Sequence, residues 1–318
     1  MPTHPTVWLR VPVPAGEAAR LRAAHPGVCF VQGDAPDAEA LAAVTVLLTA
    51  EAPTDETIAR MPALAWVHTT HGGAGAVLTG PVRARGAAVS TSRGTHSPSF
   101  VEFTLAALFA FARDIPGAVR AKDARAWQEA WAVREVAGST VGIVGLGAVG
   151  SAIAAALAPL GVRAVGTRAH PERALPEGVA EAHGPDWLPH LLAQADAVVL
   201  AAPATEATRH LLDAQAFAAL RPGALVINLT TRGGVDEDAL AEALVTGRVG
   251  GAALNVFSSP NLAPNSPLWA APNVLIAPRL GSTDPGKWPR QCALFEENLR
   301  RHLAGEPLLN AVSPDAAY

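Results

Sequence analysis

Short apolar runs alternate with alanine-rich stretches along almost the whole chain. In the first hundred residues, apolar runs typical of buried strands lie at 7–11, 44–48, 64–67 and 87–89. Helices are predicted at 15–24, at 54–60 after a Pro-Thr-Asp start signal, and at 98–113. Strands that alternate with helices are typical of a parallel sheet covered by helices on both faces.

The same alternation begins again after residue 140. Further strands are expected at 141–144, 163–166, 195–201, 225–229, 251–255 and 274–277. Helices are expected at 151–160, 213–219, 235–246 and 289–304, with 127–138 as a connector. The last helix, which carries Glu296 and Arg300 at an i, i+4 spacing that favours an ion pair, is expected to return to the first unit. We therefore predict an α/β protein of two doubly wound, Rossmann-like domains with parallel sheets, the second inserted into the first.

The most specific motif lies between a predicted strand and a predicted helix. Gly145, Gly147 and Gly150 have the spacing G-x-G-x-x-G, and Ala148 and Val149 between them are further candidates for cofactor binding. In this context the glycines permit a tight turn, close approach of a pyrophosphate, and close packing of helix on strand. The helix N-terminus then offers free N–H groups to the diphosphate. The segment predicts a dinucleotide site.

Composition excludes several other classes of function. Half of the 318 residues are hydrophobic, 16% are charged and the net charge is −4, with no basic cluster for nucleic acid or an anionic membrane surface. The N-terminus lacks a signal peptide, and the apolar stretch at 100–112 is too short to span a bilayer. Cys29 and Cys292 form no metal-binding or redox motif, so we expect free thiols, no metal and a cytoplasmic protein.

Several ordered motifs resemble those of the D-isomer-specific 2-hydroxyacid dehydrogenases over nearly the whole chain. They lie at 66–73, 93–96 with Glu102 following, 141–151, 225–236, 253–257, 266–269 and 273–278. The resemblance implies a substrate domain at 1–99 plus 285–318, an NAD(P)-binding domain at 100–284, and a homodimer through the latter. It also implies hydride transfer between a nicotinamide and a small 2-oxo or 2-hydroxy acid.

In this family an Arg binds the substrate, a His transfers a proton, and a Glu holds that His. The resemblance places the Arg at Arg232, whose charged fork suits a carboxylate. The His position is occupied by Arg279 and the Glu position by Pro260. Because a buried Glu without its His would be an unpaired charge, the two losses are consistent with each other.

Arg279 cannot act as a general acid at neutral pH, although it could stabilise a developing oxyanion. Two arginines in one cleft repel unless an anion lies between them, which predicts a small anionic substrate richer in negative charge than a plain 2-oxo acid. The alternative is that Arg279 turns to solvent or to the cofactor phosphates.

Two histidines are candidates for the missing proton donor. His71 lies in the loop that, by resemblance, presents the N–H groups of Gly72 and Gly73 to the substrate carboxylate, and His96 lies after the next strand. Either imidazole has a suitable unperturbed pKa, although a loop histidine is more often structural.

The cofactor interpretation rests on the second strand of the nucleotide domain. Thr167 and Arg168 stand where an acidic residue would bind the ribose of NAD, so NADP(H) is favoured and NAD(H) remains possible. By resemblance, Ala202, Pro203 and Thr230 line the cofactor, and Asn255 stands beside the nicotinamide in place of the family's Asp.

Three functions remain open on these residues. The first is a dehydrogenase with atypical proton transfer. The second is a catalytically degenerate dinucleotide-binding sensor or scaffold, which the missing His and Glu favour. The third is a reductase of a different anionic substrate, such as an imine.

Overall fold

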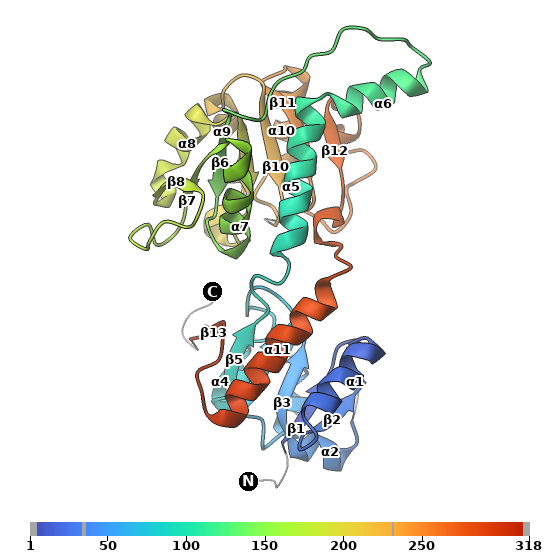
Figure 1. Ribbon diagram of the computed structural model, residues 1–318, viewed down its shortest axis with the longest axis vertical. Coiled ribbons are helices and arrows are strands. Elements are labelled where there is room, and N and C mark those ends of the chain that lie inside the picture. The colour runs from blue at the N-terminus through green and yellow to red at the C-terminus, as the bar shows by residue number, and fades with distance from the viewer. Residues whose placement is uncertain (1–4, 34–35, 231, 314–318) are drawn as a thin grey trace. The chain divides into compact units, whose positions relative to one another are not determined.

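The computed structural model describes residues 5–33, 36–230 and 232–313, which form two compact units. The first contains Met1–His96 and Pro285–Tyr318, and the second contains Ser97–Asp284. Each is an α/β unit built around its own sheet, as Figure 1 shows. The expected α/β class with two doubly wound sheets is confirmed.

In the described residues, the sheet of the first unit has six strands. In spatial order they are β13 (Ala311–Val312), β5 (Ala88–Thr91), β4 (Trp66–Thr69), β3 (Val44–Thr49), β1 (Thr6–Leu9) and β2 (Cys29–Gln32). Every pair is parallel except β13 with β5, which is antiparallel. The expected parallel pairing is confirmed in both sheets, and the exception is this edge, where the chain returns as a short antiparallel final strand.

Alternating side chains of these strands bury two apolar layers. Val7 and Leu9 pack with α1 (Ala15–Ala24) and α11 (Lys287–Ala304). Trp8 and Leu47 face the opposite layer, which contains α2 (Ala38–Ala43), α3 (Asp55–Ala59) and α4 (Gly80–Arg85). The period of two along each strand therefore distributes the helices over both faces of the sheet.

Helix α11 ties the C-terminal part of the chain to this first sheet. Phe295 stacks on Trp66 with ring centroids 5.2 Å apart. The predicted Glu296–Arg300 pair is wrong: Glu296 pairs with Arg20 of α1, and Arg300 pairs with Glu297 and Glu306. Tertiary contact with α1 replaces the local pair, which was worth only a few tenths of a kcal/mol.

The sheet of the second unit has seven parallel strands in the described residues. In spatial order they are β12 (Val274–Ile276), β11 (Val249–Leu254), β10 (Ala224–Asn228), β9 (Ala197–Leu200), β6 (Thr140–Val144), β7 (Arg163–Thr167) and β8 (Val179–His183). The strand order reverses between β6 and β9. In open α/β sheets, ligands bind at the carboxyl ends of the strands at such a point.

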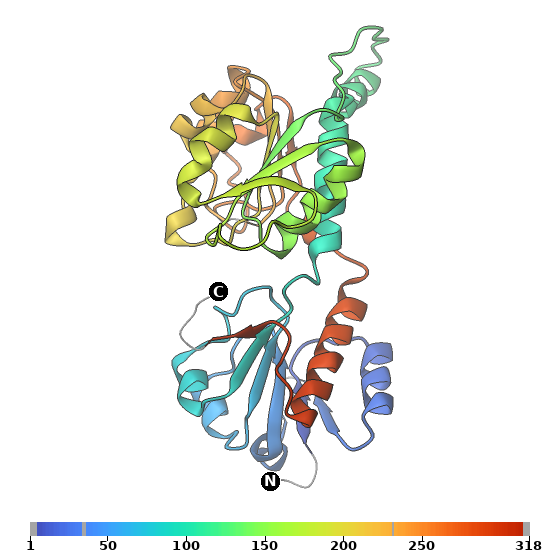
Figure 2. The ribbon, with the colours of Figure 1, turned by 60° about the vertical axis from the view of Figure 1, so that its left-hand side comes forward.

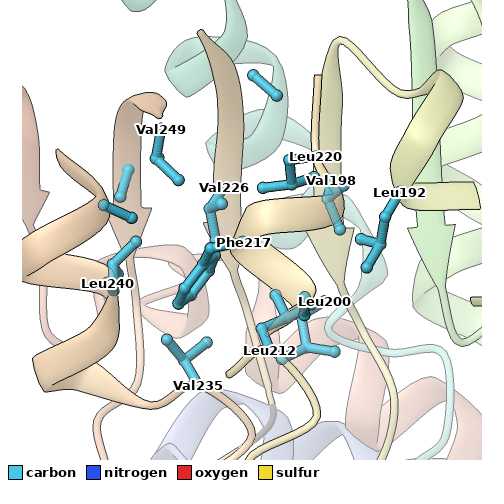
Figure 3. Close-up of a cluster of buried hydrophobic side chains, with 14 of the residues drawn as sticks. Leu192, Val198, Leu200, Leu212, Phe217, Leu220, Val226, Val235, Leu240 and Val249 are labelled. Atoms are coloured by element: carbon cyan, nitrogen blue, oxygen red, sulfur yellow. The ribbon is translucent and has the colours of Figure 1, made fainter. Parts of the chain in front are cut away.

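Helices cover both faces of this second sheet. One face packs on α5 (Ser97–Ala112) and α7 (Ala148–Leu157). The other packs on α8 (Leu188–Gln194), α9 (Ala214–Ala219) and α10 (Glu237–Val245), where Phe217 of α9 lies against Val226 of β10 in Figure 3. Short 3₁₀ turns are η1 (Ala158–Leu160), η2 (Pro185–Trp187), η3 (Glu206–Thr208), η4 (Pro267–Trp269) and η5 (Leu280–Ser282).

One segment of the second unit projects from its body. Helix α6 (Ile115–Asp123) and the connector after it extend outward in both Figures 1 and 2. The sequence patterns predicted the connector but missed α6, whose start is fixed by Asp114 accepting from the backbone N–H of Gly117 at 3.0 Å. None of the helices in the described ranges is long and apolar enough to cross a membrane.

Candidate functional site

Two of the three glycines in the loop after β6 lie in close contact with neighbouring backbone atoms. Gly145 has φ of +101°, and a Cβ there would lie 2.6 Å from the backbone N of Ala202. A Cβ on Gly150 would lie 2.2 Å from the carbonyl oxygen of Gly145. Both positions therefore require glycine, the first for its backbone conformation and both for close approach.

Gly147 differs from its two neighbours because it is open. A Cβ there would meet no atom within 4 Å, and no side chain caps the N-terminus of α7 that Gly147 begins. The N–H groups of Gly145 and Leu146 donate to the carbonyl of Thr167, whereas Ala148 and Val149 lie in the first turn of α7. An uncapped helix start beside open space fits the diphosphate of a dinucleotide.

The end of β7 carries the two residues that bear on cofactor choice. Thr167 is buried. Arg168 is half-buried, and its guanidinium donates to the carbonyls of Ala174 at 3.1 Å, Pro171 and Arg173. The side chain therefore folds over its own loop, and the end of β7 carries a cation in place of a carboxylate.

The loops after two neighbouring strands, β9 and β10, meet beside the glycine loop. The hydroxyl of Thr230, after β10, donates to the carbonyl of Ala202, after β9, at 3.1 Å. Pro203 follows Ala202 and is exposed, and its carbonyl accepts from the Thr208 hydroxyl at 2.7 Å. The structure thus brings Gly145, Ala202 and Thr230 together at the strand reversal.

Asn255, at the end of β11, is engaged within the protein. Its buried amide donates from Nδ2 to the carbonyl of Leu229 at 2.7 Å and accepts at Oδ1 from the N–H of Gly281 at 2.7 Å. Asn255 therefore braces the loops that follow β10 and β12.

The two arginines follow β10 and β12 at the same edge of the sheet. Arg232 and Arg279 are both exposed. Within the described residues, neither guanidinium has a hydrogen-bond or ion-pair partner. Pro260 lies in the irregular, exposed segment after β11, where Glu237 of α10 accepts from the N–H of Ser258 at 2.6 Å.

In the first unit, the loop after β4 carries the glycines and His71. The amides of Gly72 and Gly73 donate to no acceptor in the described ranges. Partial desolvation of the ring, and then the charge of Lys287, lowers the pKa of His71, while the charge of Glu51 opposes the shift. Its imidazole lies at the surface.

His96 is held by a different contact. Gln291 of α11 donates from Nε2 to the carbonyl of Thr70 at 2.8 Å and lies 3.1 Å from Nε2 of His96. Because an amide nitrogen only donates, Nε2 of His96 accepts and the ring proton is assigned to Nδ1. This bond fixes the orientation of the imidazole.

Two further histidines stand out that sequence patterns did not single out. His210 donates its backbone N–H to the carbonyl of Gly233 at 2.8 Å, and its Nδ1 lies 3.8 Å from a carboxylate oxygen of Asp236. It therefore borders the loop of Arg232. Its positive φ of 47° was not foreseeable from a single chain, since histidine rarely adopts it.

His68 is the second of these histidines and is fully buried in β4. Its Nδ1 lies 2.7 Å from the hydroxyl of Ser90 and its Nε2 lies 3.1 Å from that of Ser92. Burial lowers the pKa of His68 to about 3, so the ring is neutral and structural.

Comparisons with known proteins identify the family to which this arrangement belongs. Residues 105–281 match the family model described as the NAD binding domain of D-isomer specific 2-hydroxyacid dehydrogenases. A D-isomer specific 2-hydroxyacid dehydrogenase from Xanthobacter autotrophicus, solved with NADPH and MES, superposes with a TM-score of 0.84 at 33% identity, covering 99% of this chain and 100% of the other.

Curated relatives point in the same direction. A D-3-phosphoglycerate dehydrogenase from Mycobacterium leprae is 34% identical over 88% of this chain and 52% of its own length, so this chain spans about half of that relative. A glyoxylate/hydroxypyruvate reductase B from Pectobacterium carotovorum is 33% identical over 69% of this chain and 71% of its own length. The resemblance of the motifs is confirmed: the chain belongs to the D-isomer-specific 2-hydroxyacid dehydrogenase family.

Proposed function

We propose that this protein is an NAD(P)-dependent oxidoreductase acting on the CH–OH group of a small, anionic 2-hydroxy acid, or on the matching 2-oxo acid. One observation carries the proposal. The second unit combines an open, uncapped helix start at Gly147 with an exposed Arg232 that has no partner among the described residues, both at the carboxyl edge of one sheet. The first feature suits a diphosphate and the second suits a carboxylate.

The residues of this chain divide the work of the reaction. Arg232 binds the substrate carboxylate through its guanidinium fork. The amides of Gly72 and Gly73, which donate to no acceptor among the described residues, are the carboxylate donors that the family resemblance implies. The nicotinamide, when bound, supplies or accepts the hydride. His71 supplies the proton, because its ring is exposed and without a hydrogen-bond partner among the described residues, whereas His96 is tied to Gln291.

NADP(H) is the favoured cofactor. Thr167 and Arg168 end β7 without a carboxylate, and Arg173 adds a second cation to the same loop. A carboxylate at this place would repel a 2′-phosphate, whereas guanidinium groups attract one. NAD(H) remains the alternative, because the Arg168 guanidinium already donates to carbonyls of its own loop.

We also propose a homodimer through the nucleotide-binding unit. The projecting segment exposes Ile115, Val119, Val133 and Trp127, the last with 90% of its surface accessible. An exposed apolar group on a projecting arm is typical of a protein interface. Trp127→Glu is expected to convert a dimer to a monomer in light scattering.

A reducing compartment, and so a cytoplasmic location, fits both cysteines. Cys29 and Cys292 are free thiols, and Cys292 is buried, where burial raises its pKa to about 11. A thiol in that state is unreactive.

A dinucleotide-binding sensor is the second candidate, and the observation that favours it is the pair Arg279 and Pro260 at the family's proton-transfer positions. Oxidation of NADPH with glyoxylate, hydroxypyruvate and oxaloacetate distinguishes the two. We expect turnover, and we expect Arg232→Gln to lower kcat/KM by about 10²-fold, the loss of a charged hydrogen-bond pair. Cofactor binding without turnover across the panel contradicts the enzyme and supports the sensor.

The matched control is Arg221→Gln. Arg221 precedes β10 at the opposite edge of the sheet and pairs with Asp196 at 2.8 Å on the surface. Surface pairs of this kind contribute roughly 0–1 kcal/mol, so this variant is expected to fold and to turn over as the parent does.

A further inference from the structure

Arg279 combines an exposed, charged side chain with a backbone that is held by hydrogen bonds. Its φ of 60° lies in the left-handed region, which residues other than glycine and asparagine rarely adopt. Its N–H donates to the carbonyl of Asn255 at 2.8 Å, and its carbonyl accepts from the N–H groups of Ser282 at 3.0 Å and Thr283 at 2.8 Å. The backbone is therefore held at both ends while the guanidinium is exposed and without a partner among the described residues.

The loop that carries Arg279 is also linked by hydrogen bonds to the loop that carries Arg232. The Asn255 side chain joins the carbonyl of Leu229 to the N–H of Gly281. Leu229 lies three residues before Arg232, and Gly281 lies two residues after Arg279. One buried amide thus sets the spacing of the two loops that carry these cations.

Strand order places the two arginines near each other. β10 and β12 flank β11, so their carboxyl ends lie two strand spacings apart, roughly 10 Å. Two long side chains from such positions can contact one small molecule. Like charges repel, and an anion between them converts that repulsion into attraction.

The cofactor diphosphate does not suit Arg279 as a partner. The diphosphate is expected at the start of α7, which follows β6. Strand β6 lies four strand spacings from β12, or roughly 19 Å. A guanidinium stays charged in water and cannot hand a proton to the substrate. Among the anions of the proposed reaction, an acidic group on the substrate is therefore the partner that the strand order favours.

We infer that the substrate carries two acidic groups: its 2-oxo or 2-hydroxy carboxylate binds Arg232, and a second carboxylate or a phosphate binds Arg279. The inference rests on the proposed function and assigns Arg279 as its specificity-determining residue. Guanidinium groups bind carboxylate and phosphate through the same paired donors, so the experiment includes substrates that carry either group.

Matched pairs of 2-oxo acids test this assignment. Pyruvate is compared with oxaloacetate, and hydroxypyruvate with its 3-phosphate ester, each with NADPH. We expect kcat/KM to favour the doubly acidic member of at least one pair by about 10-fold or more, the effect of one charged hydrogen bond. The pair with the larger ratio identifies carboxylate or phosphate as the second group.

Arg279→Asn is the appropriate variant, because asparagine tolerates the left-handed backbone and the fold is expected to persist. We expect it to reduce the ratio within the preferred pair towards one, and Arg279→Lys to restore part of it. Arg221→Gln, which removes a cation from the opposite edge, is the control and is expected to leave the ratio unchanged.

Two outcomes overturn the inference while the proposed function survives: singly and doubly acidic substrates turn over equally, or Arg279→Asn lowers kcat/KM for both alike. If nothing turns over, the proposed function fails, and thermal stabilisation by unreactive anions in the presence of NADPH decides instead. Stabilisation by malonate over acetate that Arg279→Asn removes supports the second acidic group. No difference between malonate and acetate overturns it.

Discussion

The carboxyl ends of the strands in the second sheet form two regions, the glycine edge after β6 and the arginine edge after β10 and β12, and the two are built in opposite ways. At the glycine edge, after β6, Gly145 and Gly150 approach backbone atoms so closely that no side chain fits. At the arginine edge, after β10 and β12, Arg232 and Arg279 are exposed and unpaired in the described parts of the chain. Backbone geometry defines the first edge, and side-chain charge defines the second.

This difference separates the region that is expected to bind the cofactor from the region that is expected to select the substrate. Backbone amides at a helix start attract any diphosphate, so the glycine edge fits a cofactor shared by many enzymes. Exposed arginines on braced loops distinguish ligands by the number and spacing of their charges. Specificity in this protein is therefore expected to depend on the arginine edge.

The largest effect is expected from removal of the proton donor, because the arginines cannot supply a proton. If His71 is the donor, His71→Asn lowers kcat for reduction by about 10²-fold, the lower end for general acid catalysis. The donor must be protonated in that direction, and partial desolvation and the charge of Lys287 lower the pKa of His71 from 6.5. Reduction by the parent should therefore fall as pH rises through a value below 6.5.

The variants that check this donor are measured between pH 5 and pH 8. His71→Asn should remove the falling limb, and His96→Asn should keep it. Loss of the limb in His96→Asn alone would transfer the role to His96. A flat profile in the parent would contradict both.

Much of the glycine edge was predictable from the sequence, because glycine spacing reports backbone constraints directly. The strand before Gly145 occurs where the apolar run predicted it, and the helix begins at Ala148, three residues before the predicted start. The internal engagement of Asn255 was not predictable, since its partners Leu229 and Gly281 come from distant parts of the chain. A residue type indicates what an amide can bond, and the fold decides which groups reach it.

The arginine edge was predictable only in part. Family motifs located Arg232 and Arg279, but the left-handed backbone of Arg279 has no signal in the sequence. Sequence patterns also missed His210, because its contact with Gly233 joins two loops through backbone atoms. Contacts between loops depend on tertiary structure, whereas strands and helices follow local periodicity.

A pair of alanine variants separates cofactor binding from folding at the glycine edge. Gly150→Ala puts a Cβ 2.2 Å from the carbonyl of Gly145 and should lower the free energy of unfolding by roughly 1–3 kcal/mol, with weaker NADPH binding. Gly147→Ala meets no atom within 4 Å, so its thermal midpoint should match the parent while NADPH binding weakens. Equal NADPH affinity in Gly147→Ala and the parent would contradict a diphosphate at this position.

Arg168 gives the smallest expected effect and tests whether the two edges are as distinct as they look. It lies at the glycine edge, yet it is a cation, and its guanidinium is held by the carbonyls of Ala174 and Pro171. If that held charge attracts a 2′-phosphate, Arg168→Gln should reduce the preference for NADPH over NADH by about 10-fold, since a charged hydrogen bond contributes roughly 1.5 kcal/mol. The ratio of kcat/KM values for the two cofactors measures it, with Arg221→Gln as the control. An unchanged ratio would mean that Arg168 only shapes its loop, so that charge selects ligands at the arginine edge alone.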